Sequence, residues 1–173
     1  MKEAIGQTIS LQVILVFMIF LNAFLAFSVN YTKAFRVKNK VINVIEQNEG
    51  ITGTIGDSAD AKTTRGEINA YTSSVGYTGK TDNDTKSNGW RNGIKVVAHC
   101  VGTIGSNKGC PDVPVAGVKY RVYYSVTTSI NFHVPIIGPI FETASGDLNL
   151  MQVKGDTSMI YIDGSVLNDR LGW

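Results

Sequence analysis

The chain has 173 residues, enough for one small domain and one appendage. Its 16 Lys and Arg residues against 14 Asp and Glu residues give a net charge of +2, so neither a nucleic-acid partner nor an acidic solvating tail is indicated. Two Cys and two His residues leave little material for a metal cluster, and the sequence indicates no cofactor.

The first predicted element is a transmembrane helix at residues 11–29, preceded by a short leader-like segment at residues 1–10. The run LQVILVFMIFLNAFLAFSV carries no charge. As a helix it rises roughly 28 Å, close to the thickness of the bilayer's hydrocarbon core. The alternative is a secretory signal peptide, whose apolar core usually has only about 7–15 residues. Its best cleavage candidate, at residues 23–26, lies inside the run, so the pattern favours a retained span.

The helix is expected to continue beyond the membrane as an amphipathic extension at residues 30–49, because this segment contains neither Pro nor Gly before Gly50. Polar residues recur at a spacing of three and four, at Lys33, Arg36, Lys40, Asn43 and Gln47. An apolar stripe that should pack on the soluble domain is formed by Ala34, Val37, Val41, Val44 and Ile45. Gly50 is the expected C-cap. An unrelated juxtamembrane helix after the span is the alternative.

Two amides interrupt the apolar span. Gln12 and Asn22 are ten residues apart, so they point to similar sides of the helix, within about 80°. A lone amide facing lipid is costly, and interhelical hydrogen bonds between such groups contribute roughly 0.6–2 kcal/mol. We expect this side to face another membrane helix; the alternative is that both amides bond their own backbone or lie near the interface.

The remaining residues, 50–173, are predicted to form a domain that begins with a helix at residues 59–74. Asp57 or Ser58 is the expected N-cap. A thin apolar face would consist of Ala59, Ile68, Ala70, Tyr71 and Val75. A polar loop at residues 76–92 follows, with Trp90 expected to reach the core.

Strands are predicted at residues 94–101, 118–134, 148–153 and 158–162. The first of these is rich in β-branched residues. The second run is too long for one strand, so we expect a bend or bulge near residues 125–129. Its alternation places Val118, Tyr120, Val122 and Tyr124 on one face. The predicted fold is α+β: a long N-terminal helix packed on a small antiparallel β-sheet.

Cys100 and Cys110 are separated by a glycine-rich loop that could bring the two sulfurs together. A disulfide is therefore the favoured interpretation, and free thiols are the main alternative. A zinc site with His99 and Asp112 is disfavoured, because structural zinc sites usually contain closely spaced Cys pairs.

The sequence contains no convincing catalytic site. Neither His99 nor His133 accompanies a recognisable nucleophile motif. Residues 82–84 resemble the start of a calcium loop, but Lys86 and Ser87 occupy positions where that pattern needs an oxygen ligand and a Gly. We therefore expect a protein that is not an enzyme and has no small-molecule substrate.

An apolar, proline-containing segment at residues 134–141 cannot form a regular strand or helix. It is interpreted either as a loop that closes the core or as an exposed loop that docks on a partner or on the membrane surface. The residues of this candidate docking loop are Pro135, Ile136, Ile137, Pro139, Ile140 and Phe141.

Several segments along the chain have a recognisable order. Gly6 and Gln7 precede the span, and the sequence YTKAFRVKNK follows it at residues 31–40. Farther on, alternating Val and Tyr lead into the proline-containing segment at residues 134–141, and a Ser-containing β segment follows at residues 144–151. This layout resembles the TadE-like proteins, which are pilin-like (pseudopilin) components of tight-adherence pilus systems, and the likeness covers most of the chain.

The resemblance implies a single-span, non-enzymatic minor pilin or pseudopilin that assists assembly of a surface pilus or secretion apparatus with other pilin-like subunits or platform proteins. It implies a cytoplasmic N-terminus and an extracytoplasmic domain, although the basic residues after the span favour the opposite topology by the positive-inside rule. Processing would occur between Gly6 and Gln7, but Leu11 and Gln12 stand where the family has Glu. The alternative is a membrane-anchored extracellular binding or sensor module without filament partners.

Overall fold

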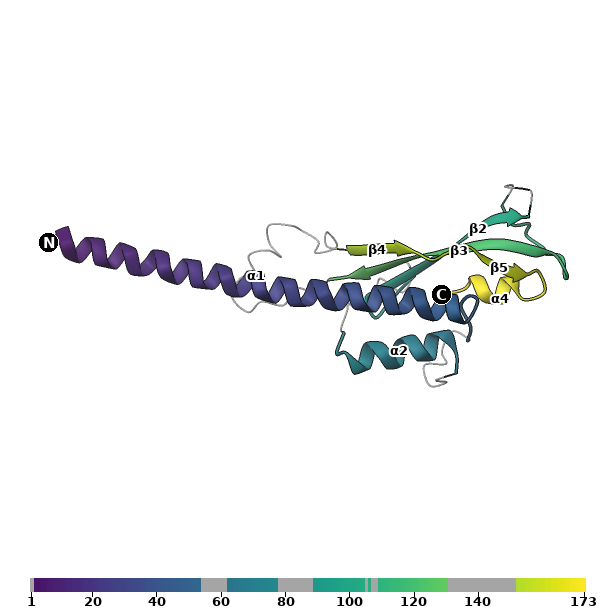
Figure 1. Cartoon of the computed structure of the whole chain (residues 1–173), viewed down its shortest axis with the longest axis horizontal. Helices are drawn as coiled ribbons and strands as arrows, with labels where there is room; N and C mark the ends of the chain where they lie inside the picture. The colour runs from purple at the N-terminus through teal and green to yellow at the C-terminus, as the bar shows by residue number, and fades with distance from the viewer. Residues whose placement is uncertain (1, 54–61, 78–88, 105, 107–108, 131–151) are drawn as a thin grey trace. The chain divides into compact units, whose positions relative to one another are not determined.

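The computed structural model describes residues 2–53, 62–77, 89–104, 106, 109–130 and 152–173, with side chains from residue 9 onward. The chain divides into two compact units. One consists of Met1–Thr32 with Phe132–Leu150, and the other of Lys33–Asn131 with Met151–Trp173. Within the first unit, the described residues belong to the N-terminal part of helix α1. The second unit holds the rest of α1 and the other helices and strands that the structure describes (Figure 1).

Helix α1 runs without interruption over Lys2–Gln47, which confirms the predicted continuity of span and extension. It ends in a Schellman motif, in which the Gly50 N–H donates to the Ile45 carbonyl at 2.9 Å. The left-handed residue of this motif is Glu49, with φ 51°, so the prediction of Gly50 as the cap is one residue late. Gly50 has φ 122°, and a Cβ there would lie 2.8 Å from the Tyr124 hydroxyl.

The second unit contains an antiparallel sheet. Its strands are β1 (Trp90–Arg91), β2 (Ile94–Thr103), β3 (Lys119–Ser129), β4 (Gln152–Asp156) and β5 (Ile160–Asp163). Their order is β1-β2-β3-β4, and β5 also pairs with β3. The predicted α+β class, a long helix with a small antiparallel sheet, is therefore confirmed.

Strand β3 ends at Ser129, and its register shows no bulge near residues 125–129, where a bend or bulge was predicted. The irregularity lies in β2, where the register shifts between Cys100 and Gly102. Gly102 has φ 122°, and a Cβ there would lie 2.6 Å from the Ser106 carbonyl oxygen. The close approach of the following loop therefore fixes the position of this bulge.

Strands β4 and β5 share one side of β3, because β2 occupies the other side along its length. Between them, Thr157 leaves the ladder: its N–H donates to the Tyr124 carbonyl at 2.9 Å, and its Oγ1 accepts from the Tyr124 N–H at 2.9 Å. Next to it, the Glu46 carboxylate accepts from Ser158 N–H at 2.7 Å and Ser158 Oγ at 2.8 Å.

The predicted strand at 158–162 corresponds to β5. Of the one predicted at 148–153, only its last two residues are described, and they belong to β4.

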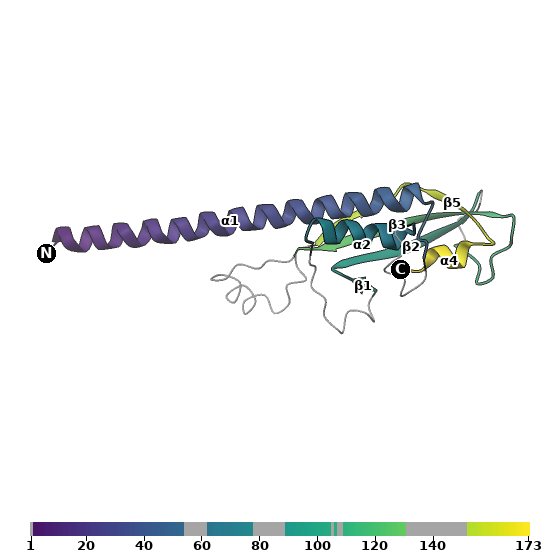
Figure 2. The ribbon, with the colours of Figure 1, turned by 90° about the horizontal axis from the view of Figure 1, so that it is seen from below.

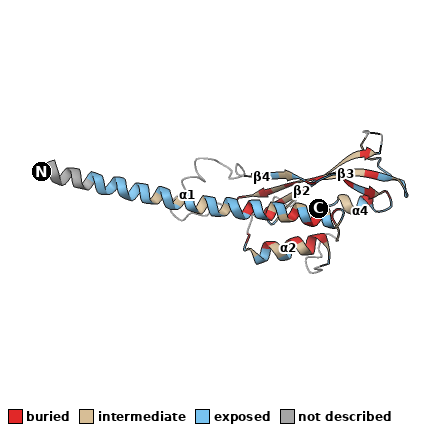
Figure 3. Ribbon diagram, in the orientation of Figure 1, coloured by how far each residue is buried: buried red, intermediate tan, exposed pale blue. Residues whose placement is uncertain are grey.

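The core lies between the second half of α1 and one face of the sheet (Figure 3). The predicted stripe of α1 is confirmed, because Ala34, Val37, Val41, Val44 and Ile45 are all completely buried. The predicted alternation in β3 is also confirmed, with buried Tyr120, Val122, Tyr124, Val126 and Thr128. The Thr128 hydroxyl donates to the Ala34 carbonyl at 3.1 Å, so this buried polar group is satisfied by the helix.

Helix α2 (Thr64–Ser74) starts later than predicted, since Thr63 is its N-cap and accepts from the Gly66 N–H at 3.1 Å. Asp57, Ser58 and Ala59 lie outside the described residues. Of the predicted apolar face, Ile68 is buried, but Ala70 is exposed. The other buried side chains of α2 belong to polar or charged residues, namely Thr64, Arg65 and Thr72. An ion pair of 2.7 Å joins Lys40 of α1 to Glu67 of α2, and the two helices lie side by side (Figures 1 and 2).

A short helix, α4 (Leu167–Leu171), was not predicted. Leu167 is completely buried, and the Arg170 guanidinium donates to the Asn48 carbonyl at the end of α1 at 2.5 Å. The Tyr124 hydroxyl donates to the Arg170 carbonyl at 2.8 Å. Trp90, expected in the core, is only half-buried in β1.

Candidate functional site

The first candidate site is the apolar part of α1. Among the described residues, one helical segment is long enough and apolar enough to cross a membrane, and it begins at Ile9. Its most apolar window has a mean hydropathy of 2.4, and none of that window is buried. Side chains such as Phe20, which is 68% exposed, would then face lipid. The predicted transmembrane helix at residues 11–29 corresponds to this segment.

Both amides of the span are exposed, and Asn22 donates from Nδ2 to the Met18 carbonyl of its own helix at 2.9 Å. The sequence left open the alternative that each amide bonds the backbone of its own helix, and Asn22 forms such a bond. Contact of Gln12 and Asn22 with another membrane helix stays a prediction. Gly6 and Gln7 lie within α1, and processing between them also stays a prediction.

The second candidate site surrounds the disulfide. Cys100 of β2 and Cys110 of the following loop are bonded, with their Cα atoms 5.6 Å apart, and both are half-buried against the core. The predicted pairing is confirmed. His99, the zinc-ligand candidate beside them, stacks on Tyr123 with ring centroids 4.8 Å apart. Nowhere in the described part of the chain do three or more His, Cys, Asp or Glu residues gather as a metal site would require.

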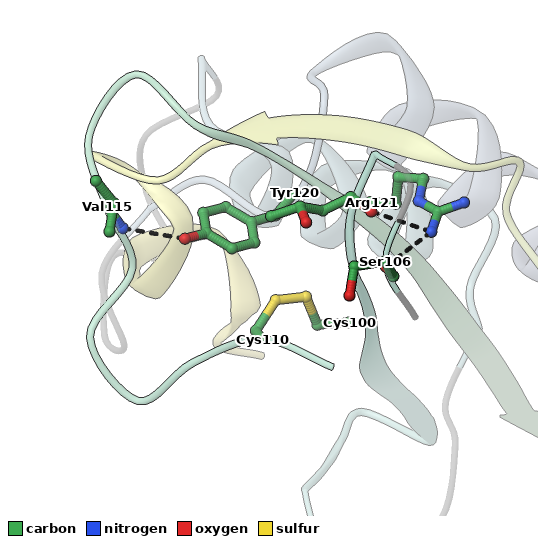
Figure 4. Close-up of a disulfide and its surroundings, with 7 residues drawn as sticks. Cys100, Ser106, Cys110, Val115, Tyr120 and Arg121 are labelled. Atoms are coloured by element: carbon green, nitrogen blue, oxygen red, sulfur yellow. Dashed lines mark hydrogen bonds between the residues drawn. A yellow bond between two sulfur atoms is a disulfide. The ribbon is translucent and has the colours of Figure 1, made fainter. Parts of the chain in front are cut away.

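The loop closed by the disulfide is held by hydrogen bonds to β3 (Figure 4). Arg121 donates from Nη2 to the carbonyls of Thr103 at 3.1 Å and Ser106 at 3.0 Å. Beyond the disulfide, the Tyr120 hydroxyl accepts from the Val115 N–H at 3.1 Å. A buried tyrosine and a cross-strand arginine therefore position a segment without regular secondary structure of its own.

Apolar side chains project from this segment and from the adjoining turn. Ile104, Val113 and Val115 are 69%, 80% and 59% exposed. We name these three residues the apolar rim. The sequence interpretation missed the apolar rim, because it considered this region only as a glycine-rich loop between two cysteines. The available signal was the presence of branched apolar residues in that loop, at Ile104, and just after it, at Val113 and Val115.

The Asp163 side chain, at the end of β5, joins the turn after β5 to the turn before β3. The Asp163 carboxylate accepts from the Ser165 N–H at 2.9 Å and from the Gly117 N–H at 3.3 Å. These hydrogen bonds, first from Ser165 and then from Gly117, hold the pKa of Asp163 below its usual value. Asp163 therefore helps to fix the base of the loop that carries the apolar rim.

The two tyrosines with shifted pKa values serve structural bonds. Burial raises the pKa of Tyr124 to about 12, and its hydroxyl binds the Arg170 carbonyl. Burial also raises the pKa of Tyr77, whose hydroxyl donates to the Ser129 carbonyl at 2.6 Å. Both phenols remain protonated at neutral pH and act as donors across the fold.

The candidate docking loop, Pro135, Ile136, Ile137, Pro139, Ile140 and Phe141, lies outside the described residues, as do His133 and residues 82–84. Docking through it therefore stays a prediction. Comparison with known proteins found no matching family model, no matching curated protein and no matching solved structure.

Proposed function

We propose that the chain is a membrane-anchored minor pilin or pseudopilin that assists assembly of a surface pilus or secretion apparatus. The observation that carries the proposal is the division of α1: an exposed apolar segment and a completely buried stripe belong to one uninterrupted helix. Such a helix would anchor the domain while forming part of its core. The N-terminus would lie in the cytoplasm, and residues 50–173 would lie outside.

The disulfide supports the proposed topology, because disulfides persist in oxidising compartments and are rare in the cytosol. The basic residues after the span argue against it by the positive-inside rule. Function would then come from contacts with other pilin-like subunits or a membrane platform. The apolar rim offers exposed side chains for such contacts.

Topology can be tested with single cysteines added to the protein that keeps its native disulfide. Ser73→Cys lies on an exposed position of α2, and Thr8→Cys, which precedes the span but follows the candidate processing site, is the matched N-terminal control. On intact cells without a cell wall, a membrane-impermeant maleimide should label Ser73→Cys but label Thr8→Cys only after lysis. The reverse pattern would exclude an extracytoplasmic domain.

The assembly role needs a genetic test. Deleting the chain should abolish surface filaments or secretion, and the wild-type chain should restore them. A matched variant with an unrelated transmembrane helix in place of residues 11–29 should restore membrane localisation but not assembly. Full assembly with the unrelated helix would show that the span is only an anchor.

A membrane-anchored extracellular binding or sensor module is the second candidate function. It is favoured by the bond from Asn22 to Met18, because an amide satisfied within its own helix needs no partner helix. Filament formation unaffected by deletion of the chain, together with extracytoplasmic labelling, would support this candidate.

A further inference from the structure

The end of the second unit at which α1 enters it is marked by a contact between helix and sheet. The Ala34 carbonyl of α1 accepts from the Thr128 hydroxyl of β3 at 3.1 Å. Thr128 pairs with Ile94 of β2 and with Val153 of β4, so these three strand positions lie in one row of the sheet. We name this end of the unit, defined by Ala34 and that row, the basal end.

Lysine and arginine side chains gather at the basal end. On α1, both Lys33 and Arg36 are exposed. In the neighbouring row of the sheet, Thr127 pairs with Lys95 of β2 and with Lys154 of β4. Directly opposed residues of neighbouring strands share one face of the sheet, so the two lysines lie on the same face, one on each side of β3. Lys154 is exposed and Lys95 is half-buried.

A further cation, Lys38, is held on α1 by two contacts. Its aliphatic chain crosses Gly155 of β4, where a Cβ would lie 3.1 Å from Lys38 Cδ. Its Nζ lies 4.4 Å from the centroid of the Phe35 ring, and Phe35 is 42% exposed. Because Phe35 precedes Lys38 by one helical turn, this cation–π contact draws the charge back along α1 toward the basal end.

The described carboxylates nearest to these cations are already engaged. Glu67 is paired with Lys40 at 2.7 Å, and Asp156 of β4 accepts from the Ser125 hydroxyl at 2.7 Å. In the part of the chain that the structure describes, the Lys40–Glu67 contact is the ion pair that forms, and it includes none of the cations at the basal end. The described side chains therefore leave this end positively charged.

We propose that the basal end binds anionic phospholipid headgroups on the surface of the bilayer that holds the span. The predicted span ends at Val29, four residues before Lys33, which is a rise of roughly 6 Å along an uninterrupted helix. This distance is within the Debye length of about 8 Å at physiological salt. Side chains of α1 also lean toward its N-terminus, and long cationic side chains can extend to the interface.

Phosphate groups suit this surface because ammonium and guanidinium groups donate charge-assisted hydrogen bonds to them. Basic clusters next to a membrane helix attract anionic lipids in this way. The inference rests on the membrane anchoring in the proposed function, but on neither its topology nor its role in assembly. It adds a second contact with the membrane, in which Lys95 and Lys154, far from the span in sequence, take part.

Lipid preference can be measured on the full chain with its native disulfide, reconstituted in vesicles of phosphatidylcholine and phosphatidylglycerol. A fluorophore on Thr32→Cys, an exposed position of α1, would report quenching by a spin-labelled form of either lipid at equal mole fraction. One cation near an anionic surface contributes about fivefold in affinity, so this parent protein should prefer phosphatidylglycerol by at least that factor. Salt at about 1 M should abolish the preference, since the Debye length is then about 3 Å.

The decisive variant is Lys95→Gln with Lys154→Gln, because a basic segment that merely follows the span would not involve these two lysines. The double variant should lower the preference for phosphatidylglycerol by at least about twofold, since two of the cations at the basal end are removed. An undiminished preference would overturn the inference and point to an acidic protein surface as the ligand of the two lysines.

The matched control is Lys62→Gln with Lys119→Gln, which removes the same charge from two exposed lysines. Both lysines lie away from the basal end. Lys119 is the first residue of β3, whereas Thr128 is near the end of that strand. Lys62 is close to Thr64, whose hydroxyl donates to the Gly50 carbonyl beyond the end of α1 at 3.0 Å. The control should keep the full preference, and an equal loss in the control would also overturn the inference.

Alkaline extraction of the same vesicles separates this inference from the anchoring on which it rests. The parent protein and both double variants should stay in the membrane, because the span is unchanged. Release of the parent protein would contradict the anchoring and the inference together. Retained protein without a preference for phosphatidylglycerol would contradict the inference alone.

Discussion

The two parts of α1 use apolar residues in opposite ways. In the part around residues 11–29 most side chains are apolar and exposed, whereas beyond residue 33 a stripe of apolar side chains is completely buried. The first pattern suits lipid, which surrounds a helix on all sides, and the second suits a protein core, which contacts one side. The spacing of apolar residues therefore indicates what covers each part of the helix, while their number alone does not.

The strongest test of this comparison places the same charge in both parts. Val41→Asp should abolish folding of the domain or cost at least about 3 kcal/mol, because an unpaired carboxylate would be buried. Val16→Asp, at a position 65% exposed, should leave the unfolding transition of the domain in detergent unchanged but reduce membrane insertion. Tryptophan fluorescence in urea and membrane fractionation measure the two effects. Equal losses of domain stability would contradict the division of α1.

Removal of the disulfide should affect the domain and leave the span intact. A Cys100→Ser, Cys110→Ser double variant should lose about 2–4 kcal/mol of unfolding free energy, since the bond restricts the unfolded chain. Non-reducing mass analysis of the wild-type protein should show a deficit of two hydrogens. Free thiols in protein isolated under alkylating conditions would contradict the bond.

High pH should weaken the domain through Tyr124. The folded-state pKa is about 12 against an ordinary value of 10.0, so the folded state holds this proton more tightly than the unfolded state. The resulting stability is complete below about pH 10 and declines as the pH rises from about 10 to about 12, by at most about 3 kcal/mol. Urea unfolding at several pH values measures the decline, and Tyr124→Phe should make it shallower. An equally steep decline in that variant would assign the effect to other groups.

Replacement of both amides of the span tests whether this side of the helix contacts another membrane helix. Gln12→Leu with Asn22→Leu should preserve insertion but weaken crosslinking to a partner helix, since each interhelical bond contributes roughly 0.6–2 kcal/mol. Leu21→Ala is a control for general effects on the span. Unchanged crosslinking and assembly in the double variant would favour the anchored binding module.

The smallest expected effect is at the end of α1. Glu49 adopts φ 51°, so Glu49→Gly should relieve backbone strain and raise the unfolding free energy by up to about 1 kcal/mol. Gly50→Ala should have the opposite effect, because a Cβ would approach the Tyr124 hydroxyl within 2.8 Å. Thermal unfolding of the two variants compares them directly, and stabilisation by Gly50→Ala would contradict the described geometry.

The features predicted correctly depend on local periodicity. The stripe of α1 and the alternation of β3 follow from spacings of three to four and of two residues, which need no knowledge of distant partners. The bulge in β2 and the left-handed Glu49 depend on contacts with Ser106 and Ile45 that periodicity does not reveal. Helix α4 has only five residues, too few for a periodic signal.

The candidate sites divide in the same way. The disulfide could be predicted because two cysteines flank a short, glycine-rich segment of the sequence. The apolar rim was missed because exposure of Ile104, Val113 and Val115 depends on where that loop is held. The contact of Arg65 with the Gly172 carbonyl gave no signal in the sequence, since only the fold brings these two residues together.

The break between β4 and β5 has a consequence for how the protein can associate. A neighbouring chain that added a strand there would need a continuous row of unpaired N–H and carbonyl groups. Thr157 and Ser158 interrupt that row, and the Glu46 carboxylate occupies the Ser158 N–H. At the other edge of the described sheet, β1 covers only Ile94 and Lys95 of β2, so the rest of β2 has no described strand beside it. Copies crowded in one membrane would therefore have little opportunity to join by backbone pairing beside β4 and β5, and any such pairing would have to use the uncovered part of β2.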